Sequence, residues 1–214
     1  MKLYSFFRSS AAYRVRIALN LKGLAYEYVP VHLRRGGGEQ FKPEYRKLNP
    51  QALVPLLDDG VQVLAKSLAI IEYLEEVHPQ PPLLPPTPAA RAHVRALALA
   101  VACEIHPLNN LRVLNYLTQV LRVSEDTMKQ WYNHWIAEGL QALEAQLAGD
   151  RARGKFCHGD APGLADCCLI PQLANARRYD CELAPFPTLL AIEKNCQALA
   201  AFQRAAPAQQ PDAE

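Results

Sequence analysis

A proline-rich segment near the middle of the chain separates two stretches with different hydrophobic patterns. Residues 78–88 contain six prolines, a density that blocks both helices and strands. Short strand-like runs alternate with helical patterns before this segment, whereas helical periodicity dominates after it. A chain of 214 residues has room for one large or two small domains. The pattern therefore predicts a domain over residues 1–80, a linker over 81–88 and an all-helical domain over 89–214.

The apolar runs and turn residues of the first domain predict an α/β fold. Two apolar runs flank an Asp-Gly pair at 59–60, which is a strong signal for a β-hairpin. The run Gly36-Gly37-Gly38 predicts a mobile loop. A βαβ unit followed by a hairpin and a helix gives a sheet with helices on its faces. We expect strands at 2–6, 26–31, 54–57 and 61–64, with helices at 13–22 and from Ser67 onward.

The second domain is predicted to consist of helices alone. Its first helix should run without a break from residue 89 to about 120, because alanine and leucine dominate there. The very apolar stretch at 164–178 is expected to be buried. Further helices are expected at 124–147, 187–196 and 198–205, with a surface tail over 207–214.

Two adjacent hydroxyls, Ser9 and Ser10, mark the start of the first predicted helix. Backbone N–H groups at a helix N-terminus have no partner within the helix, and the helix dipole is positive there. A serine at this place either caps the helix or belongs to a site that binds an anion or stabilises a thiolate. The run alone favours the cap.

Composition excludes several classes of function. The net charge of +2, with dispersed arginines, does not suggest a nucleic-acid partner. No apolar run approaches the roughly 20 residues that span a membrane, and no secretory signal is visible. Six cysteines without a CxxC pair fit reduced thiols in a cytoplasmic protein, and no His/Cys spacing predicts a metal site.

Pro55 interrupts a predicted strand, where its missing N–H excludes it from a central ladder. A trans proline that opens an edge strand is the commoner arrangement. A cis bond would instead turn the backbone of Val54 outward, toward an extended peptide.

Several motifs together resemble the zeta class of cytosolic glutathione transferases, which includes the maleylacetoacetate and maleylpyruvate isomerases. They are the double-serine run with Tyr-Arg-Val-Arg, then Leu-Asn-Pro at 48–50, Val-Pro at 54–55, Ser-Leu-Ala-Ile-Ile-Glu-Tyr-Leu at 67–74, His-Pro-Leu-Asn-Asn at 106–110 and Gln-Pro-Asp at 210–212. The resemblance covers nearly the whole chain. It implies a thioredoxin-like first domain with a cis Val54–Pro55 bond, glutathione as cofactor and a homodimer.

The resemblance also assigns roles to individual residues. Ser9 would donate to the sulfur of glutathione with help from Ser10, and Arg8 would complete the catalytic group. Arg8, Arg112 and Arg178 would bind the carboxylates of the substrate, since arginine matches that group with two donors. The residues expected to contact glutathione are Ser9, Ser10, Ala11, Gln40, Val54, Pro55, Lys66, Ser67, His106 and Asn110.

The implied reaction is the isomerisation of maleylacetoacetate to fumarylacetoacetate by reversible thiolate addition, in tyrosine and phenylalanine breakdown. Maleylpyruvate isomerisation in gentisate-type degradation is one alternative, and conjugation or dehalogenation of xenobiotics is another. Three departures from the family pattern bear on these expectations. Ala11 stands where a cysteine is usual, Lys66 where a glutamine is usual, and Gly163 replaces the Ser or Thr of a reciprocal capping box.

Overall fold

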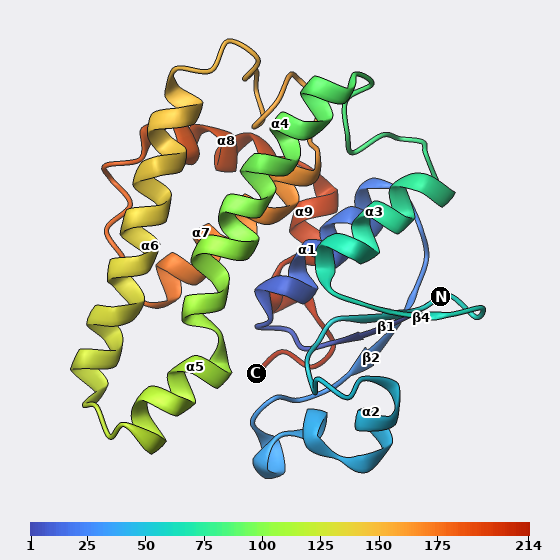
Figure 1. The fold of residues 1–214 in the computed structure, drawn as a ribbon. Helices are drawn as coiled ribbons and strands as arrows, with labels where there is room; N and C mark the ends of the chain where they lie inside the picture. The colour runs from blue at the N-terminus through green and yellow to red at the C-terminus, as the bar shows by residue number, and fades with distance from the viewer. The chain divides into compact units, whose positions relative to one another are not determined.

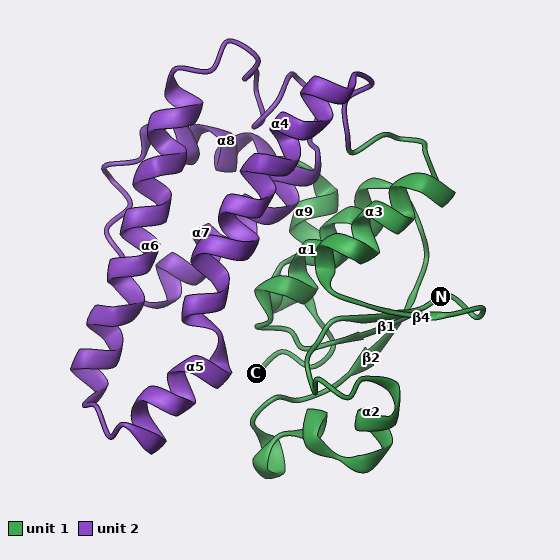
Figure 2. Ribbon diagram, in the orientation of Figure 1, with its two compact units in different colours: residues 1–83, 197–214 green, residues 84–196 purple.

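The computed structural model describes residues 1–214, which form two compact units. Unit 1 contains residues 1–83 and 197–214, and unit 2 contains residues 84–196 (Figure 2). The expected linker at 81–88 includes the boundary between them. The last eighteen or so residues, however, pack with the N-terminal elements and not with the helical unit to which the sequence pattern assigned them.

Unit 1 is built on a four-stranded sheet with the strand order β2-β1-β3-β4. β1 pairs in parallel with β2 and antiparallel with β3, and β3 and β4 form the expected hairpin. Helices α1 and α3 lie on one face of the sheet, and α2 lies on the other side (Figure 1). The elements are β1 (Lys2–Ser5), α1 (Ser10–Leu21), β2 (Glu27–Pro30), α2 (Pro43–Leu48), β3 (Leu56–Asp58), β4 (Val63–Ala65), α3 (Ser67–Val77) and α9 (Ala200–Ala205).

Apolar side chains fill both faces of this sheet. Leu56 and Leu57 are adjacent in β3 and both are buried, so neighbouring residues pack on opposite faces. Leu56 joins Phe6 and Tyr45 in the cluster beneath α2. That helix lies within residues 33–48, where the sequence pattern predicted only a loop. The Gly36–Gly38 run does form a turn, with positive φ angles at all three glycines.

The end of α1 shows why the first helix stops where the sequence predicts. Gly23 has a φ of 66°, which glycine adopts without steric cost. Its N–H donates to Asn20, and the N–H of Leu24 donates to Leu19. This pair of bonds is a Schellman motif, and it satisfies the last carbonyls of the helix.

Unit 2 consists of helices, but the single helix expected over 89–120 is broken. π-helical turns at Ala100–Ile105 and Tyr116–Val120 and a 3-10 turn at His106–Asn109 interrupt it. Pro107 has no N–H for the helical ladder, and Asn110 caps a new helix through its side chain. The α-helices of the unit are α4 (Pro88–Leu99), α5 (Leu111–Asn115), α6 (Glu125–Ala148), α7 (Leu164–Arg178) and α8 (Pro187–Gln197).

The segment expected to be a surface tail is bound to unit 1. A 3-10 turn forms at Pro207–Gln209, and the side chain of Gln210 is buried, donating to the carbonyls of Arg204 and Ala206.

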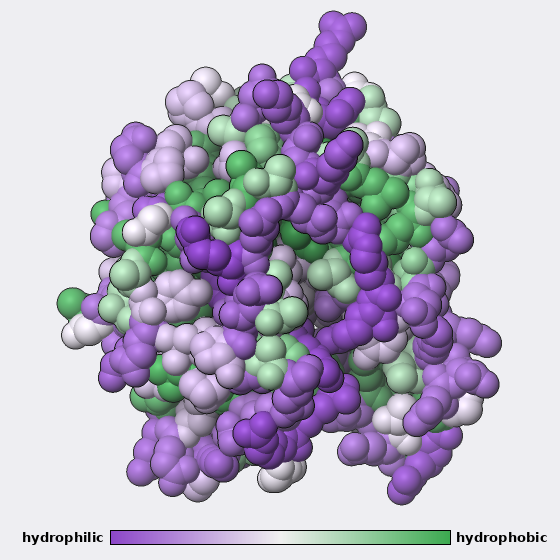
Figure 3. All heavy atoms as spheres, turned by 180° about the vertical axis from the view of Figure 1, so that it is seen from behind, coloured by the Kyte–Doolittle hydropathy of each residue, from purple (hydrophilic) through white to green (hydrophobic).

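On the surface view of Figure 3, hydrophilic side chains dominate, with small apolar groups between them. None of the helices combines the length and the apolar character that crossing a membrane requires.

Candidate functional site

The start of α1 combines a helix cap with an available hydroxyl proton. Ser9 is the N-cap residue, and its Oγ accepts from the N–H of Ala12 at 3.2 Å. Accepting this bond leaves the hydroxyl proton to be donated elsewhere. Ser10 is the first helical residue and is buried, and Ala11 behind it is half-buried. The cap favoured by the sequence alone is confirmed, and it is compatible with a donor role.

Arg8 precedes the cap on the surface of unit 1. Its side chain is exposed, and its guanidinium lies 4.8 Å from the centre of the Phe7 ring. The hydrogen bond from Arg35 lowers the pKa of the Glu214 carboxyl, and the charges of His32, Arg35 and Arg8 act in the same direction. Arg8 is therefore an exposed cation that directly precedes Ser9 in the chain and acts on the Glu214 carboxyl.

The start of α3 lies in the same unit and lacks a capping side chain. Lys66 occupies the N-cap position with a φ of 73°, which is unusual for a residue with a Cβ, and its side chain is exposed. Ser67 is buried, and its Oγ accepts from Arg14 at 3.3 Å. The Ser67 proton and the first N–H groups of α3 are thus suited to a carboxylate.

The segment before β3 places backbone groups beside the sheet. The Val54–Pro55 bond is cis, as the resemblance implies. β3 begins only at Leu56, so Val54 takes no part in the ladder between β1 and β3. Val54 and Pro55 are both buried, and Val54 belongs to the same apolar cluster as Phe6, Tyr45 and Leu56.

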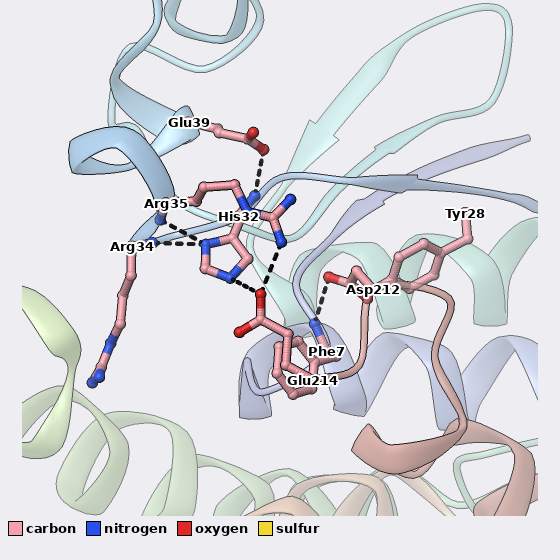
Figure 4. Close-up of polar contacts among 8 residues, drawn as sticks. All are labelled: Phe7, Tyr28, His32, Arg34, Arg35, Glu39, Asp212 and Glu214. Carbon is pink, nitrogen blue, oxygen red and sulfur yellow. Dashed lines mark hydrogen bonds and ion pairs between the residues drawn. The ribbon is translucent and has the colours of Figure 1, made fainter.

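Gln40 follows the glycine run, and a network of charged groups fixes the turn before it (Figure 4). His32 Nδ1 accepts from the N–H groups of Arg34 and Arg35 at 3.2 and 2.7 Å, and its Nε2 lies 3.3 Å from Glu214 Oε1. The His32 N–H donates to Glu39, and this bond lowers the pKa of the Glu39 carboxyl. Sequence reasoning missed this network.

The Gln40 side chain itself is almost completely buried. Its amide nitrogen donates to Leu33 O at 3.2 Å, whereas its Oε1 has no partner within the chain. A buried carbonyl oxygen without a donor is costly, and the N–H of a peptide ligand would satisfy it.

The remaining predicted residues belong to unit 2. His106 begins the 3-10 turn, and Asn110 caps α5 by accepting from the N–H of Arg112 at 3.1 Å. Arg112 and Arg178 are both exposed, as substrate-binding cations would have to be. Unit 1 thus contains nine of the candidates, and the helical unit contains four. Those in unit 1 are Arg8, Ser9, Ser10, Ala11, Gln40, Val54, Pro55, Lys66 and Ser67, and those in the helical unit are His106, Asn110, Arg112 and Arg178.

Arg178 is oriented by two tyrosines that sequence reasoning did not single out. Its guanidinium lies 5.0 Å from the ring of Tyr179, and that ring stacks on the ring of Tyr132 at 3.6 Å. Burial raises the pKa of Tyr132, while the charge of Arg178 and a hydrogen bond with it lower that pKa. No sequence signal reveals this contact, because Tyr132 and Arg178 lie on different helices.

Buried arginines are the other feature that sequence reasoning undervalued. Arg14 and Arg16 lie within the apolar pattern of α1 and are 2% and 0% exposed. Arginine is almost never fully buried without partners, so its position in that apolar pattern was an available signal.

No group of three or more His, Cys, Asp or Glu side chains is arranged to hold a metal ion.

Comparison with known proteins matches two domains of one protein family to this chain. Residues 3–82 match the model of the glutathione S-transferase N-terminal domain, and residues 129–202 match that of the C-terminal domain. The chain is 52% identical over 212 residues to the maleylpyruvate isomerase of a Ralstonia species, covering 99% of both chains. It is 47% identical over 211 residues to the maleylacetoacetate isomerase of Mus musculus, covering 98% of this chain and 94% of that one.

Solved structures show the same similarity. A zeta-class bacterial maleylpyruvate isomerase in its holo form matches with a TM-score of 0.97 and 51% identity, over the full length of both chains. A maleylacetoacetate isomerase from Methylobacterium extorquens AM1, solved with bound malonate and glutathione, matches with a TM-score of 0.96 and 43% identity, again over both full chains.

Proposed function

The chain belongs to the glutathione S-transferase family, and on that premise we propose that it is a glutathione-dependent cis–trans isomerase. Unit 1 is the thioredoxin-like half of the family's fold, and the helical unit is its all-α half. The observation that carries the proposal is the Ser9 hydroxyl, which caps α1 and keeps its proton for a donor role. We propose maleylacetoacetate as the substrate and fumarylacetoacetate as the product, in tyrosine and phenylalanine breakdown.

The residues of unit 1 fit glutathione by their chemistry. The unpartnered Oε1 of Gln40 would accept from a peptide N–H of the tripeptide. The uncapped start of α3, with Ser67, would hold a carboxylate. Glutathione when bound supplies reversible addition of its thiolate to the cis double bond, which permits rotation about that bond. Ser10, Ala11, Val54, Pro55, Lys66, His106 and Asn110 are the further residues that we propose contact it.

Ser9 would favour the thiolate form by donating to the sulfur. A thiol with a pKa of about 8.5 is only slightly ionised at neutral pH, and lowering this pKa by two units requires roughly 2.7 kcal/mol. A charge-assisted hydrogen bond of about 1–2 kcal/mol and a helix N-terminus of about 0.5–2 kcal/mol together contribute about 1.5–4 kcal/mol, which is of the order required. Arg8, with Arg112 and Arg178, would hold the substrate's carboxylates and offset the charge that develops on its carbonyl oxygen.

Substitution of Ser9 by alanine tests the proposal. We expect Ser9→Ala to lower kcat about 100-fold, the usual effect of losing one donor to a developing anion. The dissociation constant for glutathione should change much less, because the other contacts remain. Ser9 also caps α1, so Ser124→Ala is the matched control: it removes the cap of α6, where Ser124 accepts from Thr127 N at 3.1 Å. An unchanged kcat in Ser9→Ala would contradict the thiolate role.

Maleylpyruvate is the alternative substrate, and the relative from Ralstonia supports it as strongly as the maleylacetoacetate isomerases support the first choice. The values of kcat/KM on the two cis substrates decide between them. Conjugation or dehalogenation would consume glutathione, whereas isomerisation regenerates it. Ala11 removes the thiol that a mixed-disulfide route would need, so we expect no net loss of glutathione during turnover.

We propose further that the protein is a cytoplasmic homodimer. Unit 1 exposes three valines, one in the β3–β4 turn, one in β4 and one at the end of α3: Val61 is 93% exposed, Val63 41% and Val77 46%. An interface between two copies of the chain would remove such apolar side chains from water. The six cysteines, none in a disulfide, suit a reducing compartment. Sedimentation equilibrium of the wild type and of Val61→Asp tests the dimer, which the added charge should weaken.

A further inference from the structure

The turn that leads into α1 determines where Ser9 and Arg8 lie. Ser9 N donates to Phe6 O at 2.9 Å, which closes a four-residue turn with Phe7 and Arg8 at its centre. The turn itself provides no partner for the N–H or the C=O of Phe7. Both Phe6 and Phe7 are buried, so these backbone groups need partners from other parts of the chain.

Arg16, from the second turn of α1, satisfies the carbonyl side of this turn. Its guanidinium donates to Phe7 O at 3.0 Å and to Phe6 O at 3.4 Å, while its Nε donates to Ala205 O at 2.9 Å. Burial lowers the pKa of Arg16, and the nearby Asp212 is among the groups that oppose this effect. Arg16 therefore links the turn to α9, and Asp212 supplies a compensating negative charge.

Asp212, from the C-terminal segment, satisfies the N–H side. Its Oδ2 accepts from Phe7 N at 3.1 Å, and its Oδ1 accepts from the hydroxyl of Tyr28 in β2 at 2.6 Å (Figure 4). One carboxylate thus joins the turn to the edge of the sheet. These bonds connect residues that are 205 and 184 positions apart in the chain.

We propose that Asp212 is a positioning residue for the reaction, because its carboxylate fixes the turn that presents Ser9 to the sulfur of glutathione. This inference rests on the proposed function of Ser9. A displacement of about 1 Å at a reacting group can cost as much as 100-fold in rate. Ser9 directly follows the two central residues of the turn, so rotation of the Phe7 peptide would move its hydroxyl.

Replacement of Asp212 by alanine should affect chemistry more than binding. We expect Asp212→Ala to lower kcat about tenfold, to change KM for the substrate less than threefold, and to raise the pKa of enzyme-bound glutathione toward the free value of about 8.5. The ultraviolet absorbance of the thiolate against pH measures that pKa. A role in stability alone would lower the melting temperature without moving the thiol pKa.

Two further variants separate positioning from general stability. Asp212→Asn can still accept from Phe7 N through its carbonyl oxygen and can donate to the Tyr28 hydroxyl, so most of kcat should be restored. Tyr28→Phe removes the other hydrogen bond of the same carboxylate but leaves the bond to Phe7 intact. It should lower the melting temperature. The value of kcat should stay within about twofold of wild type, and the thiol pKa should stay within about 0.2 units.

The outcomes distinguish this inference from the proposed function. Wild-type kcat and thiol pKa in Asp212→Ala, together with an inactive Ser9→Ala, would overturn the positioning role alone. Wild-type kcat in both variants would overturn the proposed function as well. If Asp212→Ala does not fold, Asp212→Glu replaces it: the longer side chain keeps the charge but displaces the carboxylate, and an unaltered kcat there would equally overturn the positioning role.

Discussion

At the start of α1, one hydroxyl serves both the fold and the proposed chemistry. The sequence presented capping and thiolate stabilisation as alternatives for Ser9. The geometry makes them compatible, because a hydroxyl that accepts from Ala12 N still carries its proton. Ser67 likewise accepts one bond, from the Arg14 side chain, but it is the first residue of α3 and does not cap that helix. Both serines could be proposed from the sequence, since each directly precedes or opens an amphipathic helix.

The sequence alone does not predict the contacts that orient the candidate residues. Tyr132 lies near Arg178 and Asp212 bonds to Phe7 only because separate elements fold together. Local patterns record which residues suit a helix end or a strand, but not which side chains meet across long separations. Candidate residues could therefore be proposed from the sequence, whereas the side chains that they contact in the fold could not.

Adjacent arginines at the end of α7 are expected to differ in their effect on substrate binding. Arg178→Ala should raise KM for the substrate about tenfold, because a partner for its carboxylate is lost. Arg177→Ala is the matched control: Arg177 already pairs with Glu193 through both terminal nitrogens, so its loss should lower stability and leave KM unchanged. Steady-state kinetics of the two variants measure the difference. Equal KM values would contradict the role of Arg178.

At the scale of elements, periodicity predicted most helices but not their interruptions. The helix α7 runs over the predicted residues, and α6 (Glu125–Ala148) differs from the helix expected at 124–147 by one residue at each end. The prediction of one unbroken helix over 89–120 is wrong. Alanine and leucine favour a helix there, but Pro107 cannot donate to the helical ladder, and Asn110 caps a new helix. The helix α2 was missed beside the glycine run that precedes it.

The start of α7 depends on the buried carboxylate of Asp166. The sequence predicted that Gly163 would abolish the reciprocal capping box, and glycine indeed offers no side chain. The other half persists, because Asp166 accepts from Gly163 N at 2.8 Å and from Cys157 N at 2.9 Å. One carboxylate thus ties the preceding loop to the first turn of the helix.

Removal of that carboxylate should destabilise the protein strongly. Asp166→Ala is expected to lower the free energy of unfolding by about 2–4 kcal/mol, because two N–H groups lose their acceptor in a buried place. The control is Asp160→Ala, which removes a carboxylate that accepts from the exposed N–H of Lys155. That change should cost less than about 1 kcal/mol. Urea denaturation of both variants measures the difference, and equal losses would contradict the role of Asp166.

Glycine at 139 permits α6 to pack closely on the neighbouring π-helical turn. A Cβ at this position would overlap the side chain of Ile105. We expect Gly139→Ala to lower the free energy of unfolding by about 1–3 kcal/mol despite the better helix propensity of alanine. Gly149→Ala is the control, since a Cβ there meets only Ala145 O, at 3.9 Å. Thermal unfolding of the pair tests this, and a more stable Gly139→Ala would contradict the close packing.

At the scale of the whole molecule, residues that are adjacent in the sequence do not all belong to the same unit. The proline-rich segment contains the boundary between units 1 and 2 at residues 83–84, but α9 and the segment to Glu214 belong to unit 1. Their contacts to α1 run through backbone carbonyls, as from Arg16 to Ala205 O and from Asn20 to Ala201 O. A bond to a carbonyl leaves no trace in the pattern of side chains, so composition assigned these residues to the nearer helical domain.

Three carboxyl groups of unit 1 and one of unit 2 have pKa values shifted in opposite directions, so falling pH changes their contributions to stability in opposite senses. In unit 1, a hydrogen bond from Tyr73 lowers the pKa of Asp59 to about 2. A bond from the His32 N–H lowers the pKa of Glu39, and a bond from the Arg35 side chain lowers the pKa of Glu214. Such groups stabilise the fold above their unfolded pKa of about 4 and lose this effect as the pH falls through the folded value. In unit 2, burial raises the pKa of Asp166, so protonation at falling pH adds stability there.

Acid is therefore expected to loosen unit 1 before unit 2. Between about pH 5 and pH 2, amide hydrogen exchange, corrected for its intrinsic pH dependence, should first lose protection in peptides that cover residues 27–77, and only later in those that cover 157–178. Glu39→Gln should reduce this sensitivity of unit 1, because the glutamine has no charge to lose on acidification. Glu44→Gln, on the exposed surface of α2, is the matched control and should leave it unchanged. Earlier loss of protection in the helical unit would contradict the assignment of these signs.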